Sequence, residues 1–237
     1  MQGSSKKKAL GIVGGMGPMA TVDLFRKIVR YTDASSDSEH IRILIDNRPE
    51  IPDRTAAIFA GEDTPLRYIV ESARSLVASG ANLIAIPCNT SHYFYDRIAA
   101  LCPVPVMNMI EETALCLKEK GISCVGVLAT DGALRVGVYS HVLARHGICT
   151  LAPSVEGQAR VTHMIYGEIK AGNTPHPERL FADFEEMKKR GAEAIVLGCT
   201  ELPLAFEGVS CDLPLLDPTD ILARAAILRA GYRVREC

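Results

Sequence analysis

Two cysteines stand at matching places in the sequence, where a thiol could act as a base. Cys88 follows the apolar run at 83–86, and Cys199 follows the apolar run at 194–197. A cysteine that leaves a strand and enters a helix meets unpaired backbone N–H groups and the positive end of the helix dipole. Such surroundings favour the thiolate and lower the pKa of the thiol. The sequence therefore predicts two reactive thiols.

A pair of activated thiols indicates different chemistry from a single one. One activated thiol is typical of nucleophilic catalysis. Two thiols on opposite walls of a cleft could invert a carbon centre, because one removes a proton and the other supplies a proton to the opposite face. The alternative interpretation is structural, with both cysteines simply buried at strand ends.

The remaining cysteines carry no recognisable pattern. The chain has 8 cysteines and no C-x-x-C pair, which excludes a zinc ribbon and a thioredoxin motif and leaves no expected metal site. A disulfide framework is not expected in a chain of this length without an export signal. We therefore expect most of these thiols to be reduced and buried as small hydrophobic side chains.

Short apolar runs alternate with amphipathic segments along the chain. Strands are predicted at 10–13, 41–45, 83–86, 104–107, 124–128 and 194–197, and helices at 19–31, 64–79, 91–100, 134–146 and 177–190, with a polar loop at 46–55. Uniformly apolar strands that alternate with helices predict an α/β fold, in which helices cover both faces of parallel sheets.

The two halves of the chain resemble each other. Segment 80–88 aligns with 191–199, segment 11–13 with 126–128, and segment 105–108 with 214–217, at nearly equal separations. This repetition predicts two pseudo-symmetric α/β lobes with the active site in the cleft between them. We place the first lobe at 1–108 and the second at 109–212, and we expect 213–237 to pack back on the first lobe.

Six motifs in this order resemble the aspartate/glutamate racemase family, and in particular its cofactor-independent aspartate racemases. They are GGMGPMAT at 14–21, IPDRTA at 51–56, PCNTSH at 87–92, MIEETA at 109–114, KAGN at 170–173 and GCTE at 198–201. The resemblance extends from Lys8 to Ala226. It implies a two-lobed fold, no pyridoxal phosphate, no metal, and proton transfer by two bases, Cys88 and Cys199.

An amino acid with two carboxylates would suit the polar residues of these motifs. Arg54 offers a planar fork for a carboxylate and Lys170 a second positive charge, and by resemblance both hold the side-chain carboxylate. Amides and hydroxyls next to the cysteines can hold the α-carboxylate and stabilise a carbanion-like transition state. The predicted substrate-binding residues are Met16, Gly17, Arg54, Asn89, Thr90, Thr130, Lys170 and Thr200.

Three further residues leave alternatives open. His92 lies one helical turn after Cys88, and Glu201 lies two residues after Cys199. Each could tune its cysteine, or serve as a cap or a support. Asp131 departs from the family pattern, and if it faced the cleft it would repel a dicarboxylate, which affects the choice of substrate rather than the chemistry.

Two other functions compete with racemisation. The segment GMGPMA at 15–20 has the form of a dinucleotide-binding turn, with Asp46 as the acidic ribose ligand, which would indicate an oxidoreductase. The same turn could equally hold a carboxylate through its backbone N–H groups. The second alternative is a non-catalytic amino-acid-binding protein built on the same lobes.

Composition and charge limit the partners. With 28 acidic and 26 basic residues, the chain lacks the positive excess typical of nucleic-acid binders. Its apolar runs are far shorter than the roughly 20 residues that cross a membrane, and its N-terminus does not have the pattern of a signal peptide. The sequence thus predicts a soluble, cytoplasmic homodimer that racemises a small acidic amino acid, aspartate before glutamate, without a cofactor.

Overall fold

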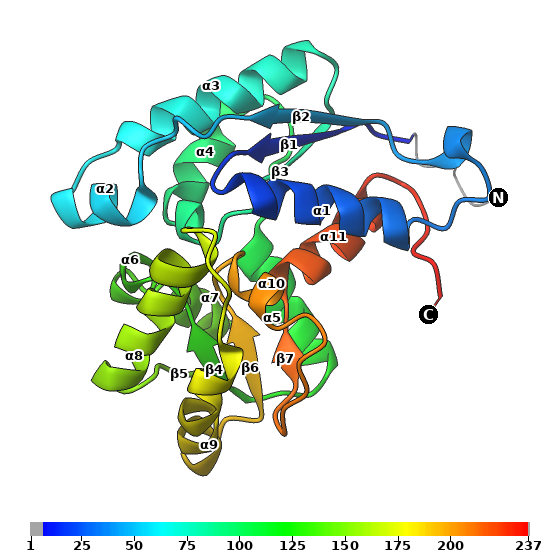
Figure 1. Cartoon of the computed structure of the whole chain (residues 1–237). Helices are drawn as coiled ribbons and strands as arrows, with labels where there is room; N and C mark the ends of the chain where they lie inside the picture. Colours follow the sequence, from blue (N-terminus) through cyan, green and yellow to red (C-terminus); the bar gives the residue numbers. More distant parts are fainter. Residues whose placement is uncertain (1–6, 237) are drawn as a thin grey trace.

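The first of two parallel sheets lies in the N-terminal half of the chain. The structure is a computed structural model that describes residues 7–236. The sheet contains β1 (Leu10–Gly14), β2 (Ile43–Asn47) and β3 (Leu83–Ala85), in the order β2-β1-β3. The central strand β1 is buried along its whole length. The strands are parallel, so their carboxyl ends lie at one edge of the sheet (Figure 1).

The second sheet repeats this arrangement. It contains β4 (Cys124–Leu128), β5 (Cys149–Leu151), β6 (Ala194–Leu197) and β7 (Leu215–Leu216), in the order β5-β4-β6-β7, with all pairs parallel. Two parallel sheets in two lobes confirm the predicted α/β class.

The register of the strands is the same in both sheets. Gly11 of β1 pairs with Ile84, and Gly126 of β4 pairs with Ile195. A Cβ atom would lie 2.7 Å from Cδ1 of Ile84 at the first glycine and 2.6 Å from Cδ1 of Ile195 at the second. Both positions thus need glycine for the same reason, which is the close approach of an isoleucine side chain.

The strand predicted at 104–107 is wrong. Only Val106 forms a bridge, to Ile84, and the carbonyl of Pro105 accepts a hydrogen bond from the amide of Ile84 at 2.9 Å. Prolines at 103 and 105 have no N–H group to donate, so they interrupt the ladder. The equivalent segment of the second lobe contains a single proline, Pro214, and forms the short strand β7.

Helices cover the two sheets. The first half contributes α1 (Pro18–Tyr31), α2 (Arg54–Ala60), α3 (Thr64–Ala78), α4 (Tyr95–Leu101) and the 3-10 helices η1 (Asp37–Glu39) and η2 (Thr90–Phe94). The second half contributes α5 (Met109–Glu119), α6 (Asp131–Arg135), α7 (Val138–Arg145), α8 (Val155–Thr162), the π-helix η3 (His163–Ile169), the 3-10 helix η4 (Pro177–Leu180), α9 (Phe181–Lys189), α10 (Leu202–Ala205) and α11 (Pro218–Arg229). Within residues 7–236, no helix is long and apolar enough to cross a membrane.

Several predicted helices are divided in the structure. The segment predicted at 134–146 is α6 followed by α7, because Gly137 between them adopts a left-handed φ of 64°. The segment at 91–100 is η2 followed by α4, and the segment at 177–190 is η4 followed by α9. The predicted loop at 46–55 is shorter than expected, since β2 continues to Asn47 and α2 begins at Arg54 with Asp53 as its N-cap.

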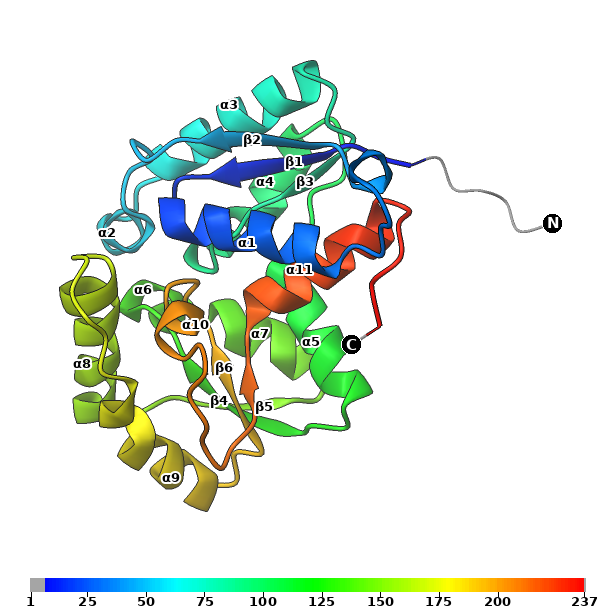
Figure 2. The same ribbon diagram turned by 45° about the vertical axis from the view of Figure 1, so that its right-hand side comes forward.

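Two helices, α5 and α11, each come after one sheet in the chain and cover the other sheet. Helix α5 follows the first sheet, yet Ile110 and Leu117 are buried in one core with Val125 of the second sheet. Helix α11 follows the second sheet, yet Leu222 is buried in one core with Leu10 of the first sheet. In Figure 2, α11 lies next to α1. The lobes are therefore interlocked by two exchanged helices. The boundaries at 108 and 212 stay a prediction, and residues 1–6 and Cys237 lie outside the described chain.

Candidate active site

A small cavity between the lobes brings together the predicted chemistry. Its lining residues are Met16, Asp53, Arg54, Thr55, Cys88, Asn89, Thr90, Thr130, Tyr166, Lys170, Cys199, Thr200 and Glu201. They include both cysteines and every predicted substrate-binding residue except Gly17. The free volume is about 10 Å³, which is room for one water molecule. The site is therefore closed in this structure.

A larger cavity lies on another side of the molecule. It has a volume of about 1160 Å³ and runs between α1, α5 and α11. It contains neither Cys88 nor Cys199. We assign the active site to the small cavity because the paired thiols and the two predicted cations meet there.

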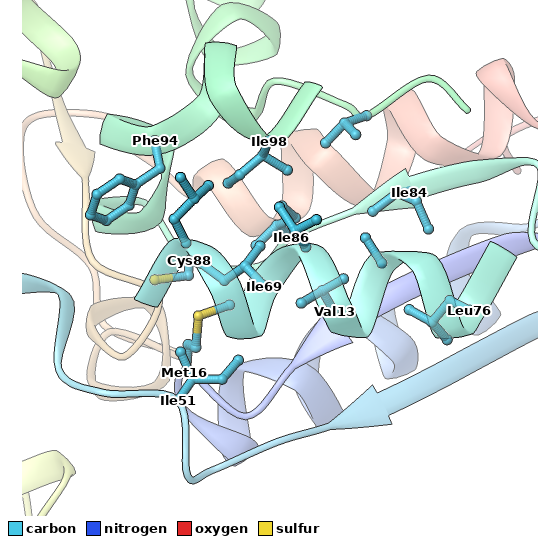
Figure 3. Close-up of a cluster of buried hydrophobic side chains, with 14 of the residues drawn as sticks. Val13, Met16, Ile51, Ile69, Leu76, Ile84, Ile86, Cys88, Phe94 and Ile98 are labelled. Carbon is cyan, nitrogen blue, oxygen red and sulfur yellow. The ribbon is translucent and has the colours of Figure 1, made fainter. Parts of the chain in front are cut away.

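Cys88 stands at one end of the first hydrophobic core. Figure 3 shows Cys88 in one cluster of buried side chains with Met16, Ile86 and Phe94. The residue is 4% exposed. The strand β3 carries it to this place, since β3 ends at Ala85 and the chain continues through Ile86 into η2. The apolar run that predicts the strand thus also buries the cysteine.

His92 contacts the backbone of Cys88. Its Nδ1 lies 2.9 Å from the carbonyl oxygen of Cys88, and its Nε2 accepts a hydrogen bond from the amide of Met109 at 3.0 Å. The proton is therefore on Nδ1, which donates to the carbonyl. Burial lowers the pKa of His92, so the ring is neutral. In this arrangement His92 holds the turn after β3 in place.

Arg54 uses most of its hydrogen bonds within the protein. Nη1 donates to the carbonyls of Ile51 and Pro52 at 3.3 and 3.1 Å, and Nη2 donates to the carbonyl of Met16 at 3.2 Å. Its Nε is buried and has no hydrogen-bond partner within residues 7–236. Backbone carbonyls thus occupy both N–H groups of Nη1 and one of Nη2 in this closed state. The donors left for a ligand are Nε and the second N–H of Nη2, on the side of the guanidinium that faces Cys88.

Two positive charges face the cavity. Burial acts to lower the pKa of Arg54, but Cys88 and nearby carboxylates outweigh it and raise the pKa. The pKa of Lys170 is raised in the same way, because Glu201 and both thiols outweigh the lowering effect of burial. Its Nζ lies 3.6 Å from Oε1 of Glu201. Both side chains are therefore charged at neutral pH, as an anionic substrate requires.

Cys199 differs from the prediction. Its Sγ donates to Oε2 of Glu201 at 3.0 Å. Burial raises the pKa of Cys199 well above its usual value, and the negative charge of Glu201 raises it further. The predicted lowering is wrong because α10 has only 4 residues and provides little dipole against these two effects. Cys199 therefore holds its proton in this state.

A second buried donor is free at the cavity. Oδ1 of Asn89 accepts from the hydroxyl of Tyr139 at 2.6 Å, while its Nδ2 has no partner in the described part of the chain. An unpaired buried donor costs about 1–3 kcal/mol. Nδ2 of Asn89 and Nε of Arg54 thus point to a ligand that accepts from both.

Hydroxyl groups close the cavity between the lobes. Oγ1 of Thr90 lies 3.0 Å from Oγ1 of Thr130, which also caps α6 by accepting from the amide of Ala133. Gly17, the N-cap of α1, lies next to the carboxylate of Glu201, since a Cβ atom at this position would be 3.1 Å from Oε1 of Glu201.

Asp131 points away from the cavity. Its two oxygens accept from Gln158 at 2.9 Å and from Thr162 at 3.0 Å, on the side of α8. The possibility that Asp131 repels a dicarboxylate is therefore removed.

Sequence reasoning missed several lining residues. Asp53 and Thr55 lie in the IPDRTA motif beside Arg54, so the motif itself could have indicated them. Tyr166 lies on the π-helix, and its hydroxyl donates to Thr55 at 3.5 Å. Tyr139 lies outside the cavity lining, and its hydroxyl donates to Oδ1 of Asn89. These tyrosines carry no signal in the sequence, because only the packing of distant segments brings them to the cavity.

Two lobes of like topology that each contribute a buried cysteine to one shared cavity define a class of protein, the two-lobed α/β racemases. The family model for Asp/Glu/hydantoin racemases matches residues 13–226. The chain belongs to this family. It is an amino-acid racemase, and hence an isomerase, as predicted. The dinucleotide-binding and non-catalytic alternatives are accordingly set aside.

Individual relatives agree with this assignment. An aspartate racemase structure from Picrophilus torridus is 32% identical, covers 96% of each chain and has a TM-score of 0.83. A structure described as a putative Asp/Glu racemase from Yersinia pestis is 28% identical, with a TM-score of 0.82 over 94% of this chain and 99% of that one. The broad specificity amino-acid racemase RacX of Bacillus subtilis (strain 168) is 26% identical over 224 residues, 92% of this chain and 96% of the relative.

Proposed function

We propose that this racemase interconverts L- and D-aspartate, with glutamate as the second choice, by cofactor-independent proton transfer between Cys88 and Cys199. The observation that carries the proposal is the shared cavity, where two buried thiols from equivalent strand ends meet the buried guanidinium of Arg54 and the partly exposed ammonium of Lys170. The named aspartate racemase of Picrophilus torridus supports the choice of aspartate. The expected homodimer and cytoplasmic location stay predictions.

The binding roles follow from the free donors. Nε of Arg54 and the ammonium of Lys170 would hold the side-chain carboxylate. Nδ2 of Asn89, together with Thr90 and Thr200, would hold the α-carboxylate, on which charge develops when the α-proton leaves. A bound dicarboxylate would satisfy both of the buried donors that have no partner in the closed cavity.

The proton path uses the two walls in turn. By resemblance to the family, Cys199 takes the α-proton from the L-isomer while Cys88 supplies a proton to the opposite face, and the D-isomer reverses the roles. Cys199 must first lose its own proton, and Glu201 at 3.0 Å is placed to accept it. Each thiol can serve only the face that it touches.

Proton exchange in D₂O tests the proposal. L- and D-aspartate and glutamate are incubated separately with the enzyme, and α-proton loss is followed by NMR together with optical rotation. We expect both enantiomers of aspartate to reach the racemic mixture with incorporation of deuterium. Chelators and removal of pyridoxal phosphate should leave the rate unchanged. A loss of activity on either treatment would contradict the cofactor-independent mechanism.

Serine variants test the two bases. Cys88→Ser and Cys199→Ser should each abolish racemisation, since a full turnover uses both walls. Cys199→Ser should keep slow exchange of the D-isomer, and Cys88→Ser slow exchange of the L-isomer. Cys116→Ser, at a half-buried cysteine outside the cavity, is the matched control and should be fully active. Two-way racemisation in either cavity variant would overturn the two-base mechanism.

A further inference from the structure

Two more cysteines face each other at the opposite end of the second sheet. Cys124 is the first residue of β4 and Cys149 is the first residue of β5. The two are register partners in this parallel pair. Partner residues in adjacent strands point to the same face at a strand spacing of about 4.8 Å. This spacing lies within the Cα separation of about 4.4–6.8 Å that a disulfide requires.

The two cysteines differ in exposure, and one of them is open to solvent. Cys149 is exposed and Cys124 is half-buried. Burial, followed by a hydrogen bond with Cys149, raises the pKa of Cys124 to about 11. Cys149 is therefore the sulfur that a reagent in solution meets first. The expectation that most cysteines are buried is wrong, since among the cysteines of residues 7–236 only Cys88 and Cys199 are buried.

We propose that Cys124 and Cys149 form an oxidation site that closes to an intramolecular disulfide when a peroxide reaches Cys149. The thiolate of Cys149 attacks the peroxide O–O bond, and the departing hydroxide takes up the proton that the thiol has released, which gives a sulfenic acid and one water molecule. The sulfur of Cys124 then attacks the sulfenic sulfur, the S–S bond forms, and a second water molecule leaves. The peroxide gains two electrons and the two thiols lose them.

The position of the pair separates this oxidation from catalysis. The five residues of β4 span about 16 Å at roughly 3.3 Å per residue, and the cavity residue Thr130 lies beyond the other end of this strand. A disulfide at the amino ends of β4 and β5 therefore joins an edge strand to its neighbour without filling the cavity. Formation of the disulfide consumes oxidant at the surface. Cys88 and Cys199 are buried, so the oxidant does not reach them there.

Peptide mapping tests the site directly. The full-length enzyme is treated with one equivalent of hydrogen peroxide, unreacted thiols are alkylated, and the protein is digested with trypsin without reduction. Cleavage after Lys120, Arg135, Arg145 and Arg160 places the two cysteines in separate peptides, 121–135 and 146–160. We expect these peptides to appear as one disulfide-linked species that dithiothreitol separates, while the treated enzyme keeps its racemase activity.

Matched variants complete the test. Cys149→Ser should give no linked species and should keep its racemase activity, whereas Cys211→Ser should give the linked species as the parent enzyme does. First oxidation at Cys88 or Cys199 would overturn the proposal. So would a disulfide between Cys149 residues of two chains, or sulfinic acid at Cys149 without the cross-link. None of these results depends on which amino acid the enzyme racemises.

Discussion

Cys88 and Cys199 leave equivalent strands, yet their side chains have different neighbours. The sulfur of Cys199 donates to the carboxylate of Glu201, which in turn lies 3.6 Å from Lys170. A carboxylate beside a thiol opposes its ionisation, and burial acts in the same direction. Cys199 thus carries its proton in the closed state and can donate it. The pseudo-symmetry of the fold does not extend to the charges around the thiols.

Glu201→Gln should make Cys199 ionise more easily. Glutamine keeps the shape and an acceptor oxygen but removes the negative charge, so the pKa of Cys199 falls, while burial still keeps it above the usual value. The measurement is the rate of iodoacetamide alkylation of Cys199 against pH, in a Cys88→Ser background. The half-maximal rate should move to lower pH. Glu207→Gln, at an exposed carboxylate, should leave the profile unchanged. A shift to higher pH would contradict the role given to Glu201.

Helix α1 is held to the start of α11 by a small network of buried charges. Lys27 lies between Asp23 on its own helix, at 2.5 Å, and Asp217, the N-cap of α11. Oδ1 of Asp217 also accepts from the amide of Thr219 at 2.7 Å. The side chain of Asp23 is 2% exposed. The lysine therefore balances two carboxylates and joins helices from the two halves of the chain.

Lys27→Ala should destabilise the protein strongly. Loss of Lys27 leaves the buried charge of Asp23 with only the half-exposed Arg26 and removes the ion pair of Asp217, for which we expect the free energy of unfolding to fall by about 3 kcal/mol. Arg26→Ala removes another ion pair of Asp23, but the arginine side chain is 51% exposed, so the expected loss is under about 1 kcal/mol. Urea unfolding followed by circular dichroism measures both. Equal losses of unfolding free energy in the two variants would contradict a larger contribution of the buried network than of the exposed ion pair.

The molecule as a whole is in a closed state. A cavity of about 10 Å³ cannot admit an amino acid, so the lobes must separate before substrate binds. They touch at the rim of the cavity, where α2 and α6 meet in both views of the molecule (Figures 1 and 2). The exchanged helices α5 and α11 join the lobes elsewhere. We therefore expect opening at the contact between α2 and α6, with α5 and α11 as the hinge.

Larger residues at position 132 should prevent complete closure. A Cβ atom on Gly132 of α6 would lie 2.9 Å from Cα of Thr55 on α2, in the opposite lobe. Gly132→Ala and Gly132→Val should lower kcat in that order, roughly tenfold and more, because misplacement by a fraction of an ångström impairs proton transfer. The thermal midpoint should stay the same or rise, since alanine is the better helix former. Full activity in Gly132→Val would exclude this contact as the closing surface.

The sequence by itself determined the two-lobed architecture and the two cysteines of the cavity. Apolar runs of strand length, glycines at close approaches and cysteines directly after two strands are local features, and short-range sterics and burial convert them into strands and strand-end side chains. That is why the sequence could place Cys88 and Cys199 in one cleft, whereas the resemblance to the racemase family placed Arg54 and Lys170 there. The strand predicted at 104–107 is wrong because two nearby prolines outweigh the apolar character of the segment.

The tertiary structure decided what those side chains can do. Four features depend on burial and on atoms from other segments. They are the raised pKa of Cys199, the backbone partners of Arg54, the outward position of Asp131 and the pairing of Cys124 with Cys149. Desolvation and charge–charge interactions act through space over a few ångströms. A pattern in the sequence identifies which groups meet, but only the packed fold sets the distances between them. These distances determine which side chains are protonated and which donors stay without a partner.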